Sequence, residues 1–155
     1  MSIDLVRSFF ATVGREHDIL EFSVSSATVE LAAEALGVAP ERIAKTMSFA
    51  DGDGCLVVVA AGDTKIDNAK YKQAFGFKAK MLPPDQVLSL TGHAVGGVCP
   101  FALPDTVRIF LDESLRRFDT VYPAAGSSNS AIQVTLPQLE NYTNGIWVDV
   151  CKPRE

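Results

Sequence analysis

Two features of the sequence could carry chemistry: a lysine at the start of an apolar run and a glycine-rich loop farther along the chain. Lys45 follows Arg42-Ile43-Ala44 and precedes Thr46-Met47. Lysine is seldom buried without a partner, so a lysine at the start of a strand either extends to water or serves a ligand. The local sequence around Lys45 leaves both interpretations open.

The loop Gly96-Gly97-Val98-Cys99-Pro100 could bind an anion or a developing oxyanion. Adjacent glycines let the backbone approach a ligand closely and direct its N–H groups at negative charge. Pro100 stiffens the end of the loop and restricts Cys99 to extended conformations. The alternative is a tight turn that only connects two elements.

Side chains in and after this loop offer further candidates. Cys99 as a nucleophile would need a base or a cation beside it, and nothing in the sequence fixes His93, six residues away, at its side. We therefore expect Cys99 to line a pocket. Ser127, Ser128 and Asn129 lie in a loop of small residues, where their hydroxyls and amide either hold a ligand or cap turns.

Familiar signatures of other enzyme classes are absent from the sequence. There is no Gly-x-Ser-x-Gly elbow, Walker loop, Rossmann glycine fingerprint or His-Glu-x-x-His motif. With only His17 and His93, a histidine-rich metal site is excluded, and the spacing of Cys55, Cys99 and Cys151 does not indicate zinc. We expect neither a metal nor a cofactor.

Charge is unevenly distributed along the chain. The net charge of −5 argues against non-specific binding of nucleic acid by the whole surface. Residues 65–80 nevertheless hold five lysines against one aspartate, a local charge of +4. This cluster is either a solvated helix face or a contact site for a phosphate backbone; its lysines are Lys65, Lys70, Lys72, Lys78 and Lys80.

Length and composition predict a single domain over residues 1–155. The hydrophobic fraction of 47% is ordinary for a globular protein, and the longest apolar run, Cys55 to Ala61, is far too short to span a bilayer. The N-terminus lacks the pattern of a signal peptide. Three widely spaced cysteines suit free thiols, so we expect a cytoplasmic protein without a membrane partner.

Hydrophobic periodicity and turn residues predict a mixed sheet with helices, because a hairpin is combined with helical crossovers. The Asp51-Gly52-Asp53-Gly54 turn joins strands 45–50 and 55–60 into this hairpin. We expect further strands over 18–23, 77–82, 107–111, 120–122, 131–135 and 146–150, and helices over 2–13, 28–36, 67–75, 84–91 and 137–142, with a short one at Pro40.

The chain resembles the YbaK/prolyl-tRNA-synthetase-associated family of aminoacyl-tRNA editing domains. The similarity runs through nearly the whole chain in one order, and a Lys-Thr pair combined with a downstream Gly-Gly-x-x-Pro-Phe is specific. The matching segments are 35–38 with Pro40, 42–46, 57–59, 66–67 with Lys70, 91–92, 95–101, 111–115 and 121–126.

The resemblance implies an α/β (α+β) fold with a barrel-like mixed sheet flanked by helices, standing free of a synthetase. It implies hydrolysis of an amino acid wrongly esterified to the 3′ end of a tRNA. Lys45 and Gly97 then correspond to the catalytic positions. The residues implied around the ester and its amino acid are Thr46, Gly96, Val98, Cys99, Pro100 and Tyr122.

An aminoacyl ester is already activated, so no serine-type triad is needed. A positioned water, polarised by the vicinal ribose hydroxyl of the substrate, can attack it. Loop N–H groups would stabilise the oxyanion, and Lys45 would anchor the terminal phosphate or the ester carbonyl. We expect the lysine cluster to guide the tRNA, and an aminoacyl-tRNA synthetase is a further expected partner.

Two departures from branches of this family bear on the amino acid to be removed. Ala124 and Ala131 occupy positions where the cysteinyl-specific branch is expected to have serine and aspartate, and Tyr122-Pro123 replaces a His-Pro pair of the alanyl-specific branch. Ser127, Ser128 and Asn129 are alternative contacts. A small side chain is expected, because synthetases discriminate missing methyl groups worst. Loss of the serine and aspartate leaves open a binding or regulatory module without turnover, and a cysteine hydrolase using Cys99 is a third interpretation.

Overall fold

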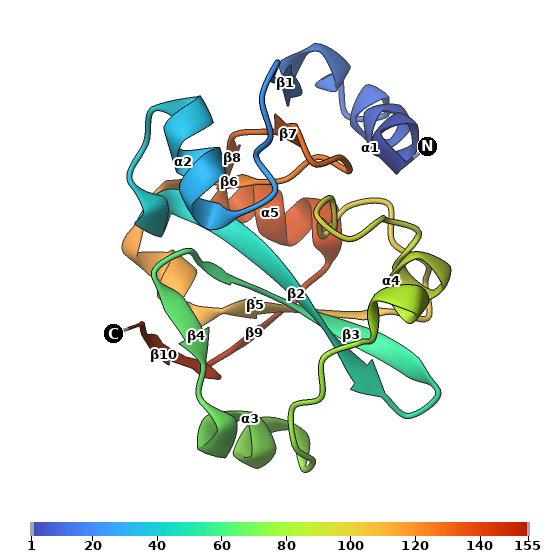
Figure 1. The fold of residues 1–155 in the computed structure, drawn as a ribbon, viewed down its shortest axis with the longest axis vertical. Helices are drawn as coiled ribbons and strands as arrows, with labels where there is room; N and C mark the ends of the chain where they lie inside the picture. Colours follow the sequence, from blue (N-terminus) through green and yellow to red (C-terminus); the bar gives the residue numbers. More distant parts are fainter. Residues whose placement is uncertain (1, 155) are drawn as a thin grey trace.

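The computed structural model describes residues 2–154, and a long hairpin forms the centre of its sheet (Figure 1). Strand β2 (Ile43–Asp51) pairs antiparallel with β3 (Gly54–Ala61), in register from Ala44 opposite Ala61 to Asp51 opposite Gly54. The turn between them requires a positive φ of 59° at Gly52, which glycine adopts without steric cost. The predicted hairpin is confirmed.

The remaining strands of the main sheet add to both sides of this hairpin. Strand β6 (Thr120–Pro123) runs parallel to β2, and β8 (Val134–Thr135) closes that side antiparallel to β6. On the other side, β5 (Arg108–Asp112) and β9 (Ile146–Val148) run parallel to β3. The strand order is β8-β6-β2-β3-β5-β9, and the sheet curls into a half-barrel. The expected mixed, barrel-like α/β fold is confirmed.

Two short ribbons stand beside the main sheet. Strand β1 (Leu20–Glu21) pairs with β7 (Ser130–Ala131), and β4 (Thr64–Ile66) pairs with β10 (Cys151–Pro153). The single strand predicted over 131–135 is therefore wrong. The chain changes partner there, because Ala131 lies opposite β1 whereas Val134 lies opposite β6.

The strand predicted over 77–82 is also wrong. Residues 77–82 pass the end of β2 but form only an isolated bridge between Met81 and Phe49. Their backbone bonds to β2 are Ala50 N–H to the Lys80 carbonyl at 2.8 Å and Leu82 N–H to the Ser48 carbonyl at 3.2 Å. The segment leaves the sheet edge after this contact, so no ladder develops.

The helices begin and end at residues that the sequence marks as caps. The Thr28 hydroxyl accepts from the Leu31 N–H, and Asp67 accepts from the first turn of its helix. Gly37, Gly76 and Gly92 end helices in the left-handed conformation, as predicted. The helices are α1 (Ser2–Ala11), α2 (Val29–Leu36), α3 (Asn68–Phe75), α4 (Pro84–Thr91) and α5 (Leu136–Thr143), with 3-10 turns at Glu16–Asp18, Pro40–Arg42 and Glu113–Arg117.

The sheet is covered on both faces, which explains the continuous apolar run of β3. Val59 packs into the core under α1 and α5, whereas Val58 packs against Tyr71 of α3 on the opposite face. Because residues opposite each other across a ladder share a face, Thr46 lies on the face of Val59 and Lys45 on that of Ala60. Over residues 2–154, no helix has the length and apolar character needed to cross a membrane.

Candidate functional site

A cavity of about 420 Å³ opens along an unpaired stretch of β2. This edge of β2 pairs with β6 at Ile43–Ala44. Among the described residues, its one further β contact is the isolated bridge between Phe49 and Met81. On this edge the Ser48 carbonyl accepts from the Leu82 N–H, and the Ala50 N–H donates to the Lys80 carbonyl. Every second residue of β2 therefore directs its backbone N–H and C=O groups away from β3. Thr46 follows the same alternation, and its N–H and C=O therefore face the cavity.

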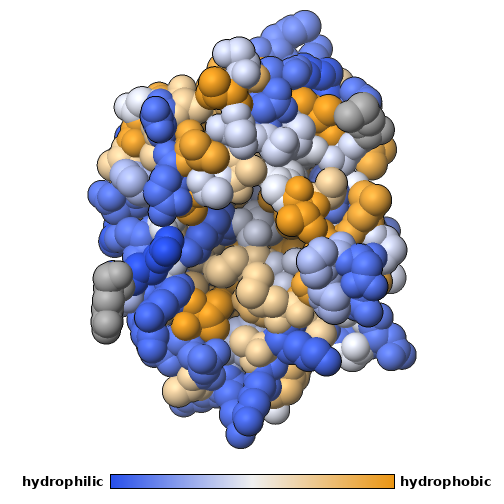
Figure 2. All heavy atoms as spheres, in the orientation of Figure 1, coloured by the Kyte–Doolittle hydropathy of each residue, from blue (hydrophilic) through white to orange (hydrophobic). Residues whose placement is uncertain are grey.

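The walls of the cavity are mostly apolar and come from distant parts of the chain. Segments before and within α2, the edge of β2, the start of α4 and the glycine loop all contribute. Figure 2 shows a hollow near the centre of this face, with hydrophobic residues along its rim. Among the described lining residues Lys45 is the single charged one, and no carboxylate faces the cavity. The cavity size is in the range of small-ligand sites.

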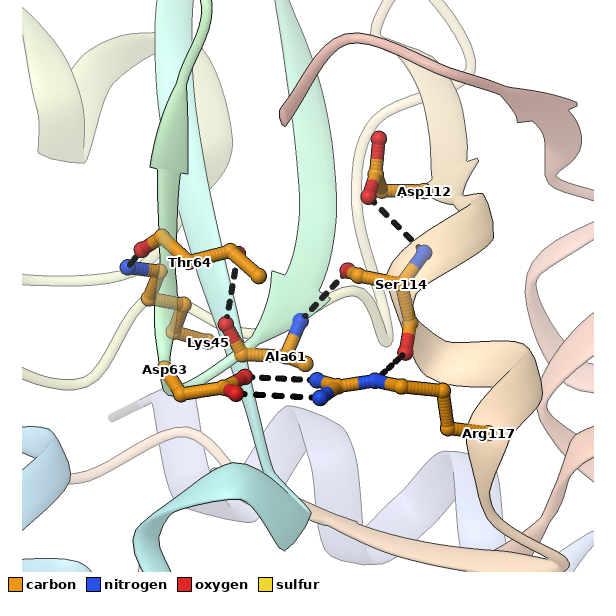
Figure 3. Close-up of polar contacts among 7 residues, drawn as sticks. All are labelled: Lys45, Ala61, Asp63, Thr64, Asp112, Ser114 and Arg117. Atoms are coloured by element: carbon orange, nitrogen blue, oxygen red, sulfur yellow. Dashed lines mark hydrogen bonds and ion pairs between the residues drawn. The ribbon is translucent and has the colours of Figure 1, made fainter. Parts of the chain in front are cut away.

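A network of hydrogen bonds and an ion pair holds Lys45 in place, and its members are distant from Lys45 in the sequence (Figure 3). Its Nζ donates a hydrogen bond to the carbonyl of Thr64, in β4. The Thr64 hydroxyl in turn donates to the Ala61 carbonyl at 2.7 Å, which fixes the turn between β3 and β4. The ammonium is thereby placed at the end of the cavity nearest β4.

The turn that carries Thr64 is anchored to the 3-10 turn at residues 113–117. Asp63 forms a two-pronged ion pair with Arg117, at 3.0 and 2.5 Å, and the Ser114 hydroxyl accepts from the Ala61 N–H at 3.1 Å. Asp112 fixes the start of that 3-10 turn by accepting from the Ser114 N–H at 2.9 Å. Four side chains outside the cavity thus determine where the Thr64 carbonyl lies.

The electrostatic environment favours Lys45 as a ligand for an anion. Burial lowers the pKa of Lys45, and the nearby positive charge of Arg154 lowers it further. Cys151, Asp63 and Glu30 raise the pKa of Lys45, but neither of the two carboxylates forms an ion pair with it. An incoming phosphate or carbonyl oxygen would relieve the desolvation of the half-buried ammonium.

The glycine loop packs tightly against the loop that contains Ser127. A Cβ atom on Gly97 would lie 2.9 Å from the Ser127 Cα, and Gly96 has a φ of 90°. The Gly97 N–H donates to the Ala94 carbonyl at 2.9 Å, so it is already used within the loop. Gly96 and Val98 line the cavity, and among the described residues their N–H groups have no protein acceptor.

The thiol of Cys99 is in the core and not in the cavity, contrary to our expectation that it lines the pocket. It is fully buried under α1, and burial raises its pKa to about 12. Its Sγ lies 3.5 Å from His93 Nε2, a proximity that the sequence did not indicate. Nε2 must itself donate to the Phe101 carbonyl at 2.8 Å, because a carbonyl only accepts, so it cannot take a proton from the thiol.

Pro100, Ser127, Ser128 and Asn129 likewise lie outside the cavity lining. The Ser127 hydroxyl donates to Asn129 Oδ1 at 2.9 Å, and Asn129 Nδ2 donates to the Phe22 carbonyl at 2.9 Å. The Ser128 carbonyl accepts from the Ser26 N–H at 2.7 Å. These residues hold the segment before α2 in place and thereby shape one wall from behind.

Thr46, Tyr122, Ala124 and Ala131 do meet at the cavity. The hydroxyl of Thr46 is buried and has no hydrogen-bond partner. Ala124 and Ala131 form an isolated bridge with each other, so the two substituted positions face the same space. Ser130, at the end of the loop of small residues, lies next to them in the lining and is 1% exposed.

The five lysines predicted to contact tRNA come from β4, from α3 and from the segment that follows α3. Lys70 forms an ion pair with Asp149 at 3.0 Å, and Lys72 lies exposed on α3. Lys78 and Lys80 follow that helix, whereas Lys65 lies in β4 directly after the residue that holds Lys45. The three cysteines belong to three different core clusters and do not approach one another as metal ligands would.

Sequence reasoning missed two groups of functional residues. The first is the network behind Lys45, formed by Asp63, Thr64, Ser114 and Arg117; its members are ordinary turn residues until the fold brings them together. The second is the apolar wall that faces β2. The one sequence signal for it is the helix predicted over 84–91, the start of which forms part of this wall. This wall includes Met81, Leu82, Val87 and Val95.

Comparisons with known proteins agree with this fold. The YwhH protein of Bacillus subtilis (strain 168) is 54% identical over the full length of both chains. The proline–tRNA ligase of Leuconostoc citreum (strain KM20) is 35% identical over 65% of this chain, which corresponds to only 18% of the ligase. A crystal structure of a candidate trans-editing enzyme for prolyl-tRNA synthetase superposes with a TM-score of 0.87, at 27% identity and 97% coverage of both chains. The model of the aminoacyl-tRNA editing domain matches residues 24–142, and the chain therefore belongs to this family.

Proposed function

We propose that this protein hydrolyses the ester bond of mischarged aminoacyl-tRNA, acting in trans as a separate editing deacylase. The observation that supports the proposal is the cavity at the open edge of β2, whose lining includes Lys45, Gly96 and Val98. The membership of the editing family and the likeness to a candidate trans-editing enzyme support it.

Lys45 is the anchor for the 3′ end of the tRNA in this proposal. Its ammonium is the single charge of the described cavity lining, and its one protein partner is a neutral carbonyl. It can therefore pair with the terminal phosphate or with the ester carbonyl while its stem stays packed against the sheet. The Asp63–Arg117 pair keeps that position fixed from behind.

The loop supplies the donors for the oxyanion. Because the Gly97 N–H is already bonded to Ala94, the free donors are those of Gly96 and Val98. Each donor of this kind contributes roughly 3 kcal/mol to transition-state stabilisation. Gly97 contributes through its lack of a side chain, which lets the loop lie against Ser127 and so aims its two neighbours.

No side chain of the cavity is suited to act as a general base. The thiol of Cys99 is protonated and remote, and His93 is buried with Nε2 committed to the Phe101 carbonyl. A water polarised by the vicinal ribose hydroxyl of the substrate is then the nucleophile, and rigid positioning of the ester provides the acceleration.

The cavity favours an amino acid with a small, neutral side chain. Methionine and valine side chains form much of its wall, and no carboxylate is available to pair with a basic substrate. Serine, threonine, cysteine and alanine are the candidates to compare.

The test is release of labelled amino acid from tRNAs charged with each of these four residues. Lys45→Met keeps most of the buried stem and removes the charge, and we expect deacylation to fall by about 100-fold, as for a misplaced ester. A thermal melt of the variant checks that it is folded. If Lys45→Met hydrolyses every ester as fast as the parent protein, the assignment of Lys45 is wrong.

A binding module without turnover is the second candidate. Ala124 and Ala131 favour it, because these two methyl groups stand together in the cavity where polar groups are expected in the cysteinyl-specific branch. It predicts that the protein, at stoichiometric concentration, protects aminoacyl-tRNA from spontaneous hydrolysis. Accelerated release of any of the four amino acids would exclude it.

A further inference from the structure

The β4–β10 ribbon places two lysines directly opposite each other. Lys65 and Lys152 are in register in this antiparallel pair, and both are exposed. Residues directly opposite share a face of the ribbon, so both side chains leave on the same side. Their neighbours Thr64, Ile66 and Cys151 are buried or partly buried on the other side, so the lysine face is the outer one.

Fold stability does not explain this arrangement. Like charges directly opposite in a ladder are destabilising. The acidic groups nearby do not form ion pairs with these lysines: Asp63 pairs with Arg117, and Asp67 accepts from the Ala69 and Lys70 N–H groups and interacts with the charge of Lys152 only without direct contact. Among residues 2–154, neither Lys65 nor Lys152 has an ion-pair partner within 4.0 Å.

The lysine pair is continuous with the end of the cavity that holds Lys45. The carbonyl that receives the Lys45 ammonium belongs to Thr64, the residue before Lys65. Arg154, two residues after Lys152, donates its N–H to the Asp63 carbonyl at 2.9 Å, and its side chain reaches only the exposed Glu30 at 3.8 Å. In Figure 1, β4 and β10 lie together beside the C-terminus, and Figure 2 shows hydrophilic residues gathered along this flank.

We propose that Lys65, Lys152 and Arg154 form a phosphate-binding track that guides the acceptor strand of tRNA to Lys45. The proposal rests on the function proposed above and names the surface that the RNA contacts. An RNA backbone is the partner that fits, because it offers a row of negative charges to a row of cations leading to the cavity. Lys70 has a smaller part in this arrangement, since it is already paired with Asp149, and Lys72 and Lys78 lie outside the β4–β10 ribbon.

The experiment measures binding of a 5′-labelled, deacylated tRNA transcript by fluorescence anisotropy as a function of salt. Each phosphate contact to single-stranded RNA contributes about 0.7 to the slope of log affinity against log salt. Lys65→Ala/Lys152→Ala should therefore lower the slope by about 1.4. Between about 50 and 200 mM salt, the parent protein should lose about sevenfold more affinity than this variant.

Two matched variants control for charge and for folding. Lys72→Ala/Lys78→Ala removes the same charge from the α3 side and should change the slope by less than half as much. Lys65→Arg/Lys152→Arg keeps the charge and should keep the slope. Melting temperatures are measured for all three, and that of the Lys65→Ala/Lys152→Ala variant should stay close to the parent value, because both the repulsion between the lysines and the attraction of Lys152 to Asp67 are removed.

The proposal is overturned if Lys65→Ala/Lys152→Ala leaves the slope unchanged, or if the α3-side variant changes it equally or more. This outcome is separate from failure of the proposed function, because binding of deacylated tRNA requires no turnover. Conversely, absence of amino acid release from every charged tRNA would refute the proposed deacylase activity. The salt dependence of tRNA binding would still test whether Lys65, Lys152 and Arg154 contact the RNA.

Discussion

Replacing Gly97 by alanine tests whether the packing of the glycine loop sets the geometry of the cavity. The added Cβ would lie 2.9 Å from the Cα of Ser127 and 3.1 Å from its backbone N and C. All three are backbone atoms of a segment that is itself tied to Ser26 and Phe22, so the segment cannot yield at low cost. The glycine loop must move instead, and Gly96 and Val98 move with it.

The expected magnitudes follow from this contact. Overpacking of this kind costs about 1–3 kcal/mol of stability, equivalent to a fall in melting temperature of roughly 2–12 °C for a chain of this length. The effect on catalysis should be larger, because displacing a reacting group by about 1 Å costs on the order of 100-fold in rate. Activity should therefore fall much more than stability does.

The assay is deacylation of the most active charged tRNA, at a temperature well below the melting point of every variant. Gly54→Ala is the neutral control, since its Cβ would meet only the Asp51 carbonyl oxygen at 3.7 Å. Gly145→Ala is the destabilising control, because its Cβ would lie 2.8 Å from Leu111 Cγ, away from the cavity lining. Comparison with Gly145→Ala separates a loss of geometry from a loss of stability.

Two results would refute this reasoning. Full activity of Gly97→Ala would show that the loop does not position the oxyanion donors. An equal loss of activity in Gly145→Ala at equal destabilisation would show that the effect is not local to the cavity.

Three further predictions concern single side chains. Cys99→Ala should keep a deacylation rate within about threefold of the parent rate. The parent activity should resist iodoacetamide at pH 8, because the thiol pKa of about 12 leaves almost no thiolate. Inactivation at a rate typical of exposed thiols would contradict this. Arg117 lowers the pKa of Asp63 below the ordinary 3.8, so the stability from this pair is present above that value and is lost as the pH falls below it. Asp63→Asn should therefore show a weaker loss of stability on acidification below about pH 4, measured by urea unfolding, and identical pH dependence would count against the pair. Thr46→Val removes a buried hydroxyl without a partner among residues 2–154 and should raise the free energy of unfolding by about 1 kcal/mol, as measured by urea unfolding. A fall in the free energy of unfolding would count against an unpaired hydroxyl at this position.

Local sequence signals were sufficient for the central hairpin and for the helix ends. The hairpin follows from the Asp51–Gly54 turn between two apolar runs, and the caps Thr28, Asp67 and Gly76 each act within a few residues. Such features depend on backbone conformation and neighbouring N–H groups, so they can be predicted without knowledge of the fold.

Short strands could not be predicted in this way, because their existence depends on a distant partner. Strands β4 and β10 have three residues each and form only because the chain end returns to residues 64–66. The apolar pattern over 77–82 predicted a strand, but this segment meets β2 at one bridge and then turns into α4. Periodicity reports which side chains are buried and does not report which strand is available for pairing.

Residue type and order were enough to indicate the two parts of the candidate site, which are Lys45 beside a hairpin strand and the glycine loop. How each part is used depends on contacts between distant segments. In the folded protein the Gly97 N–H donates to the Ala94 carbonyl, and the Cys99 side chain is buried in the core. The segment 127–129 lies behind the cavity wall and not in its lining. The tertiary structure also supplies the Thr64 carbonyl and the Asp63–Arg117 pair that hold the lysine. Hydrogen bonds between residues far apart in the chain exist only once the backbone has brought them together, so no local pattern could have predicted them.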